Sequence, residues 1–106
     1  MTFSDIEAAL SSTGRRAYAG VILAFLLDAH DRGAGLVEKH TVVENVGITD
    51  TNVSAVARRL EEQGIIEILY WDTKSESPTW SSLRNGAWSA PGYRLLPAVL
   101  QLYRRC

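Results

Sequence analysis

The chain has few of the side chains on which catalytic and metal sites depend. Its 106 residues include one cysteine, the terminal Cys106, and two histidines. One cysteine cannot form a disulfide within the chain, which is typical of a protein of the reducing cytoplasm. The sequence also lacks a glycine-rich phosphate loop, a carboxylate pair and any spacing typical of metal ligands. We therefore expect a cytoplasmic protein that is not an enzyme and needs no metal or cofactor.

A surplus of positive charge is missing as well. Lys and Arg number 11 against 12 for Asp and Glu, which gives a net charge of −1. Duplex DNA is a dense line of negative charge, and the proteins that bind it usually carry a basic face. This balance argues against strong sequence-independent DNA binding by a single chain, unless the charges are segregated by face or doubled in a dimer.

No hydrophobic run is long enough to cross a membrane. The run AYAGVILAFLL has 11 residues and follows Arg15 and Arg16, whereas a spanning helix needs about 18. A basic pair before an apolar run resembles a secretory signal, but Asp28 and Asp31 follow where small cleavage-site residues belong. The run therefore predicts a buried core helix and no membrane partner.

The remaining patterns predict one domain over residues 1–106. Hydrophobic residues make up 46% of the chain, enough for a core. Periodicity and capping residues predict helices over 4–10, 15–31, 37–46, 50–63 and 98–105. Residues 65–96 start with β-branched and aromatic residues and continue into a polar loop at 72–92, which predicts a hairpin. The expected fold class is mainly α, with five helices and a two- or three-stranded hairpin.

Individual residues are expected to cap these helices and to face the core. Ser4 and Glu7 have the spacing of a capping box. Spacings of three and four predict two inward rows: Tyr18, Val21, Ile22, Phe25, Leu26 and Ala29 in the long helix, and Val53, Val56, Ala57 and Leu60 in helix 50–63. Leu23 and Leu27 make the long helix apolar nearly all round.

The segment VVENVGITDTNVSAVARRLEEQGIIE, residues 42–67, resembles part of a winged helix-turn-helix domain. Gly47 and Ile48 match the turn glycine and the apolar residue behind it. Val53 and Leu60 match the residues that anchor the recognition helix, and Gly64 matches the turn into the wing. The resemblance implies a single winged-helix domain whose wing is residues 65–96.

That resemblance implies DNA reading by helix 50–63. The candidate contact residues are Thr51, Asn52, Ala55, Arg58 and Arg59 on the helix, with Lys74 and Arg84 from the wing. Asparagine pairs with adenine and arginine with guanine or phosphate, and a helix N-terminus favours phosphate. The first hypothesis is therefore a small regulator of transcription or replication that binds double-stranded DNA. A homodimer through the N-terminal and C-terminal helices is expected, because one such surface is weakly charged.

The same charges also have a structural explanation. Arg58 and Glu62 are four residues apart, which is the spacing of a surface ion pair. Thr49 or Asp50 can cap the helix, and an acid there complements the helix dipole. Under this interpretation these side chains stabilise the helix, and their presence is no evidence for DNA binding.

The second hypothesis is a protein-binding module on the same scaffold, which serves protein contacts as well. Its candidate partner-binding residues are Trp80 and Trp88 with Asp72 and Glu76, because tryptophan supplies much of the energy of protein interfaces. Small inhibitors from phages or mobile elements, including anti-CRISPR proteins that block a host nucleic-acid-binding complex, belong to this class. Alternatively, the tryptophans form a cluster that folds the loop against the sheet.

Overall fold

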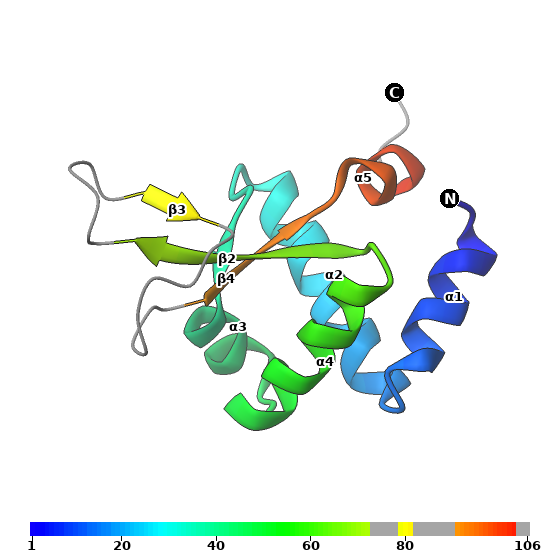
Figure 1. The fold of residues 1–106 in the computed structure, drawn as a ribbon, viewed down its shortest axis with the longest axis horizontal. Helices are drawn as coiled ribbons and strands as arrows, with labels where there is room; N and C mark the ends of the chain where they lie inside the picture. The colour runs from blue at the N-terminus through cyan, green and yellow to red at the C-terminus, as the bar shows by residue number, and fades with distance from the viewer. Residues whose placement is uncertain (73–78, 82–90, 104–106) are drawn as a thin grey trace.

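The fold is mixed α/β in the part of the chain that the computed structural model describes, residues 1–72, 79–81 and 91–103 (Figure 1). Within these residues it has five helices and a four-stranded antiparallel sheet. The elements in chain order are α1 (Phe3–Ser12), α2 (Arg16–Asp31), β1 (Val37–Glu38), α3 (Lys39–Val46), α4 (Asp50–Glu62), β2 (Ile66–Asp72), β3 (Thr79–Ser81), β4 (Pro91–Leu95) and α5 (Pro97–Tyr103).

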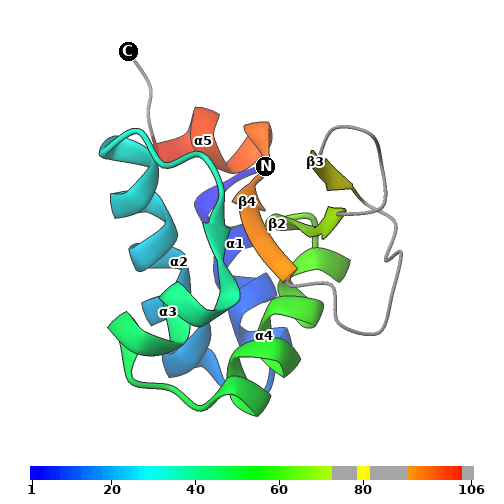
Figure 2. The same cartoon turned by 90° about the vertical axis from the view of Figure 1, so that its left-hand side faces the viewer.

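The sheet runs in the order β1-β4-β2-β3, so the last strand in sequence lies between the first two. Ile66 of β2 pairs with Leu95 of β4, and Val37 of β1 pairs with Tyr93. These four side chains are buried and belong to the core that the sheet shares with the helices. Figure 2 shows α2 and α3 on the left of β4 and α4 below it. The opposite face carries an ion pair between Glu67 and Arg94. Neighbouring residues of a strand point to opposite faces, which explains this division.

The prediction of a mainly α fold was wrong about the strands. Val37 and Glu38 form β1, and not the first turn of a helix, because they pair with Tyr93 and Gly92 of β4. A buried β-branched residue such as Val37 suits a strand better than a helix. Residues 79–81, expected in a loop, form β3 against the end of β2. The pairing of β1 joins residues far apart in the chain, so local patterns do not indicate it, whereas β2 and β3 form a local hairpin.

The capping box of α1 also differs from the expected one. Thr2, and not Ser4, is the N-cap residue: its hydroxyl accepts a hydrogen bond from the Asp5 amide at 3.2 Å. The Asp5 carboxylate accepts one from the Thr2 amide at 2.8 Å, and this hydrogen bond is the main cause that lowers the pKa of Asp5. Glu7 is paired with Arg16 of α2 instead. Two capping boxes overlap in the sequence, and the earlier one forms.

The long helix α2 buries three of the six residues that were predicted to face inward, namely Ile22, Leu26 and Ala29. Its buried residues are Ala19, Ile22, Leu23, Leu26, Leu27 and Ala29. Tyr18 and Val21 are 37% and 47% exposed, and Phe25 is half-buried. A helix that is apolar nearly all round has no single periodicity, so its neighbours decide which side is covered. The prediction was therefore wrong for Tyr18 and Val21.

The last helix joins the N-terminal one. Val99 and Leu102 are buried, and the Tyr103 ring meets Phe3 of α1 edge-on with the ring centroids 5.3 Å apart. The helix was expected over 98–105, and residues 104–106 lie outside the described residues. None of the helices in the described ranges combines the length and the apolar character that crossing a membrane requires.

Candidate nucleic-acid interface

A tight turn sets where α4 begins. α3 ends at Gly47, whose φ of 71° is a left-handed conformation that glycine adopts without strain. Ile48 is then buried, and the Thr49 hydroxyl accepts a hydrogen bond from the Asn52 amide at 3.4 Å. Thr49 therefore has the predicted role of N-cap residue. Together the turn and the cap fix the direction in which α4 leaves α3.

The inward row of α4 is confirmed. Val53, Val56, Ala57 and Leu60 are at most 1% exposed. Apolar residues at this spacing occupy one side of a helix, so the opposite side must face solvent. That side carries the predicted contact residues: Thr51, Ala55, Arg58 and Arg59 are exposed, and Asn52 is half-buried. We call these five residues the exposed row of α4.

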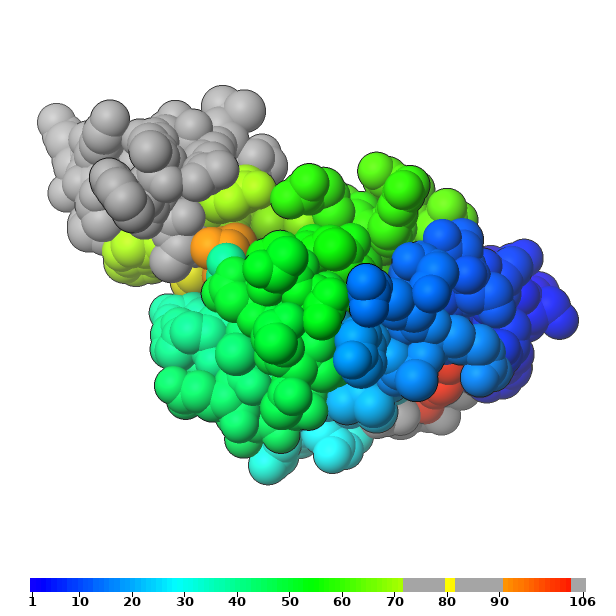
Figure 3. All heavy atoms as spheres, turned by 90° about the horizontal axis from the view of Figure 1, so that it is seen from below, coloured from blue at the N-terminus to red at the C-terminus, as the bar shows by residue number. Residues whose placement is uncertain are grey.

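The exposed row lies at the centre of one face of the molecule. Seen from below, α4 occupies the middle of the surface, between α3 and the first turn of α2 (Figure 3).

The acid at the start of α4 has a basic partner. The Asp50 carboxylate accepts a hydrogen bond from Lys39 Nζ of α3 at 3.1 Å. Lys39 is largely covered, with 22% of its side chain exposed, so its charge stays next to Asp50. This pair reduces the repulsion that Asp50 alone would exert on a phosphate near the helix N-terminus.

The glutamates at the end of α4 are also engaged, but not as predicted. Glu62 pairs with Arg59 at 3.4 Å, and not with Arg58. A helix offers Glu62 neighbours at both three and four residues, so spacing alone cannot choose between them. Glu61 accepts a hydrogen bond from the Ile68 amide of β2 at 2.9 Å. Within the described residues, Arg58 is therefore the one charged side chain of α4 without an oppositely charged or hydrogen-bonding partner.

Tyr93 of β4 lies beneath the start of α4. It is buried, and the charge of Asp50 and a hydrogen bond with Ser54 both act on its hydroxyl. Burial, and next the charge of Asp50, raise the pKa of the Tyr93 hydroxyl well above its usual range. Ser54 and the charge of Arg58 oppose this rise in pKa. Tyr93 thus links the sheet to the side of α4 that carries Asp50, Ser54 and Arg58.

The raised pKa of Tyr93 predicts a loss of stability in alkali. The unfolded chain releases this proton near the ordinary tyrosine pKa, while the folded chain retains it. Stability from Tyr93 is therefore full below about pH 10 and lost above it, by about 1 kcal/mol between about pH 9 and about pH 11. Urea unfolding at both pH values measures the change. Tyr93→Phe should flatten this pH dependence; an equally steep fall in the variant would contradict the assignment.

A second apolar cluster covers the face of the sheet that lies away from the helices. We define this tryptophan cluster as Leu36, Leu69, Trp71, Trp80 and Gly92. Trp71 and Trp80 stand opposite each other on β2 and β3, with ring centroids 5.4 Å apart in an edge-on arrangement. A Cβ atom built on Gly92 would lie 3.0 Å from the Trp80 ring and 2.8 Å from Leu36. Leu69 pairs with Gly92 and is buried in this cluster, outside the main core.

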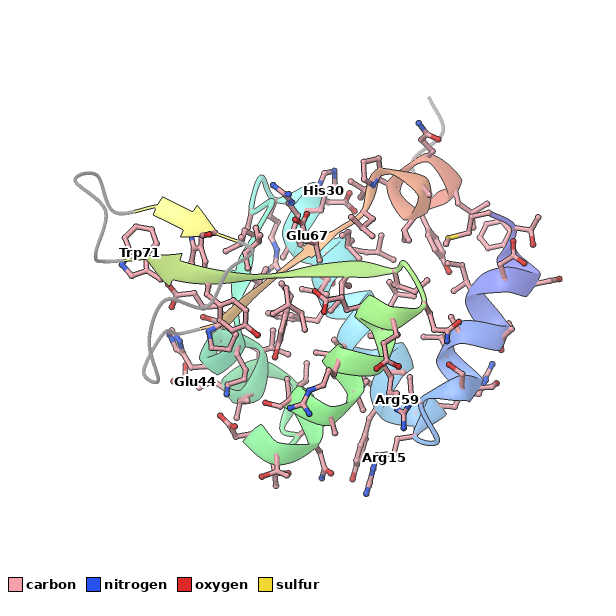
Figure 4. The ribbon with its side chains drawn as sticks, in the orientation of Figure 1. Arg15, His30, Glu44, Arg59, Glu67 and Trp71 are labelled. Carbon is pink, nitrogen blue, oxygen red and sulfur yellow. The ribbon has the colours of Figure 1, made fainter. Side chains whose placement is uncertain are left out.

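This cluster changes the roles expected of the tryptophans. Trp80, a predicted partner-binding residue, is half-buried against the sheet. Trp71 was not among the predicted partner-binding residues. It is 38% exposed at the end of β2, far from Arg59 of α4 (Figure 4). Alternation along β2 places Trp71 on the same face as Glu67 and Leu69, and this signal could have indicated it.

The other predicted site residues lie outside the described part of the chain. These are Lys74, Arg84, Glu76 and Trp88, together with the side chain of Asp72. Among the described residues, no three His, Cys, Asp or Glu side chains are grouped so that they could hold a metal ion.

Comparisons with known proteins identify no relative. No protein-family model, no curated protein and no solved structure matches the chain.

Proposed function

We propose that the chain is a winged helix-turn-helix protein that binds double-stranded DNA through the exposed row of α4, as a regulator of transcription or replication. The observation that carries this proposal is Arg58. It is exposed and unpaired within the described residues, whereas Arg59 has a partner on α4 itself. An arginine held on a rigid helix without a carboxylate partner is available to a phosphate or a guanine.

The arrangement of elements supports the proposal. Two helices joined by a tight glycine turn precede a strand, and the second of these helices exposes one side. A short strand before the first of them joins the sheet beside β4. This order is that of the winged helix-turn-helix domain that the sequence resembles, in which the exposed helix enters the major groove. The pairing of Asp50 with Lys39 reduces the repulsion that the Asp50 carboxylate would exert on a nearby phosphate.

The alternative is a protein-binding module, of the inhibitor class described above. Trp71 favours it, because this ring is 38% exposed at the end of the sheet and beside Trp80. Tryptophan is enriched at the centres of protein interfaces. In this case the partner would contact the tryptophan cluster and α4 would serve as scaffold only.

Binding of a fluorescent duplex at low salt separates the two functions. With Arg58 and Arg59 of the exposed row as two cationic contacts per chain, log affinity should fall with log salt at a slope near −2. A threefold rise in salt then weakens binding about tenfold. Fluorescence anisotropy over a series of salt concentrations measures the slope. The absence of binding at the lowest salt would contradict DNA binding and favour the protein-binding module.

A further inference from the structure

The outer side of α2 is apolar and uncovered. Ala17, Tyr18, Val21 and Ala24 are exposed and follow one another at the spacing of a single helical face. In Figure 2 the C-terminal half of α2 forms the left edge of the molecule, and no other element of the described ranges lies on its outer side there. With Phe25 and Asp28, which continue the same face, we call these residues the α2 outer face. A contiguous exposed apolar surface of this kind is typical of an interaction site.

A recess lies at one end of this face and a projecting ring at the other. A groove of about 400 Å³ borders the C-terminal half of α2, with Phe25 and Ala29 on one side and Leu36, Thr41 and Asn45 among the residues of the other. Tyr18 stands seven residues before Phe25, about 10 Å away along the helix. Arg32 and Glu38 line the groove as well, so one face carries an aromatic ring and, beside Phe25, a recess with apolar and charged walls.

The charges at the two ends of the face are opposite. Arg15 lies over the Tyr18 ring, with its guanidinium carbon 5.9 Å from the ring centroid. Asp28 lies at the other end of the face and is exposed. Neither side chain has an ion pair within the described ranges of the chain. Arg32 follows Asp28 by one turn and is also exposed, so this end carries a cation as well. Arg15 and Asp28 place opposite charges at the two ends of the apolar surface, and this pair is complementary to the same pair on a copy turned end to end.

We propose that the α2 outer face is a homodimer interface, in which the α2 helices of two copies of this chain pack antiparallel. A two-fold interface must be self-complementary, because the same patch serves both chains. With the two-fold axis beside Val21, Tyr18 of each copy meets Phe25 and the groove of the other. Arg15 of each copy then faces Asp28 of the other. No residue of the exposed row of α4 belongs to this interface.

Sedimentation of the full chain over a range of concentrations tests the proposal. One helix face on each copy buries less than a standard interface, so a weak dimer is expected, with a dissociation constant on the order of 10 µM. Val21→Glu places two carboxylates beside the two-fold axis, so this variant should be monomeric at every concentration. Ala8→Glu, a matched change at an exposed position of α1, should dimerise as the unchanged protein does.

Charge reversal tests the orientation of the two helices. Arg15→Asp alone and Asp28→Arg alone each create two like-charged contacts and should weaken the dimer about tenfold. The double variant restores opposite charges and should recover the original dissociation constant to within about threefold. The proposal is overturned if the unchanged chain stays single at all concentrations, if Val21→Glu dimerises normally, or if the double variant is as weak as the single ones.

Discussion

Arg58→Glu is expected to reduce the affinity for duplex DNA about a hundredfold at low salt. The change removes one cation from the exposed row of α4 and places an anion where phosphates approach. Loss of a base or phosphate contact by arginine costs about 1–3 kcal/mol, and repulsion adds to this cost. The fold should be unaffected, because Arg58 is exposed and has no ion pair within the described residues. Anisotropy with a fluorescent duplex measures the ratio of the two dissociation constants.

Two further variants distinguish a specific contact of Arg58 from an effect of net charge, and a guanine contact from a phosphate contact. Arg32→Glu makes the same change in net charge at the exposed C-cap of α2, where the guanidinium donates a hydrogen bond to the Asp28 carbonyl at 3.4 Å and has no ion pair among the described residues. It should weaken binding only slightly. Arg58→Lys keeps the charge but loses the planar fork, so it should restore binding to phosphate and not to guanine. Equal losses in Arg58→Glu and Arg32→Glu would show that net charge alone, and not α4, governs binding.

The second large effect is expected at Gly92, in the tryptophan cluster. In an open strand, valine in place of glycine stabilises the sheet, because β-branched residues favour strands. Here the new Cβ would lie 3.0 Å from the Trp80 ring and 2.8 Å from Leu36. The Leu36 methyl group can turn away, whereas the ring is held against Trp71. The cost of overpacking should exceed the gain from the strand preference of valine. Gly92→Val should therefore lower the free energy of unfolding by about 2 kcal/mol.

Gly20 supplies the matched control. It lies within α2, and a Cβ built there meets no atom within 4 Å. Gly20→Ala should therefore raise the free energy of unfolding by about 0.5–1 kcal/mol through helix propensity. Urea unfolding of both variants gives the two values. A stabilised Gly92→Val would mean that Trp80 does not pack on β4, and the cluster as described would be wrong.

The features that were predicted correctly depend on residues close together in the chain. The inward row of α4 follows from the spacing of Val53, Val56 and Leu60, and its start follows from Gly47 and Thr49. Caps, turns and helical faces are local, so five candidate contact residues could be placed on one side of α4 from sequence alone.

The features that were missed depend on contacts between distant segments. β1 forms because Val37 meets Tyr93, and Trp80 is half-buried because it reaches Gly92 across β2. The residues that flank one member of each of these pairs in the sequence do not indicate which residue the other member is. The exposed side of α2 was misjudged for a related reason, since an all-round apolar helix takes its orientation from whatever packs against it.

The measurement closest to the central claim is the low-salt duplex titration of the unchanged chain, followed residue by residue through the backbone amide chemical shifts. If α4 binds DNA, the largest changes should fall on Thr51, Asn52, Ala55, Arg58 and Arg59. The amides of the α2 outer face should shift little. Changes centred on Trp71 and Trp80, or no changes at any salt concentration, would contradict the proposed role of α4.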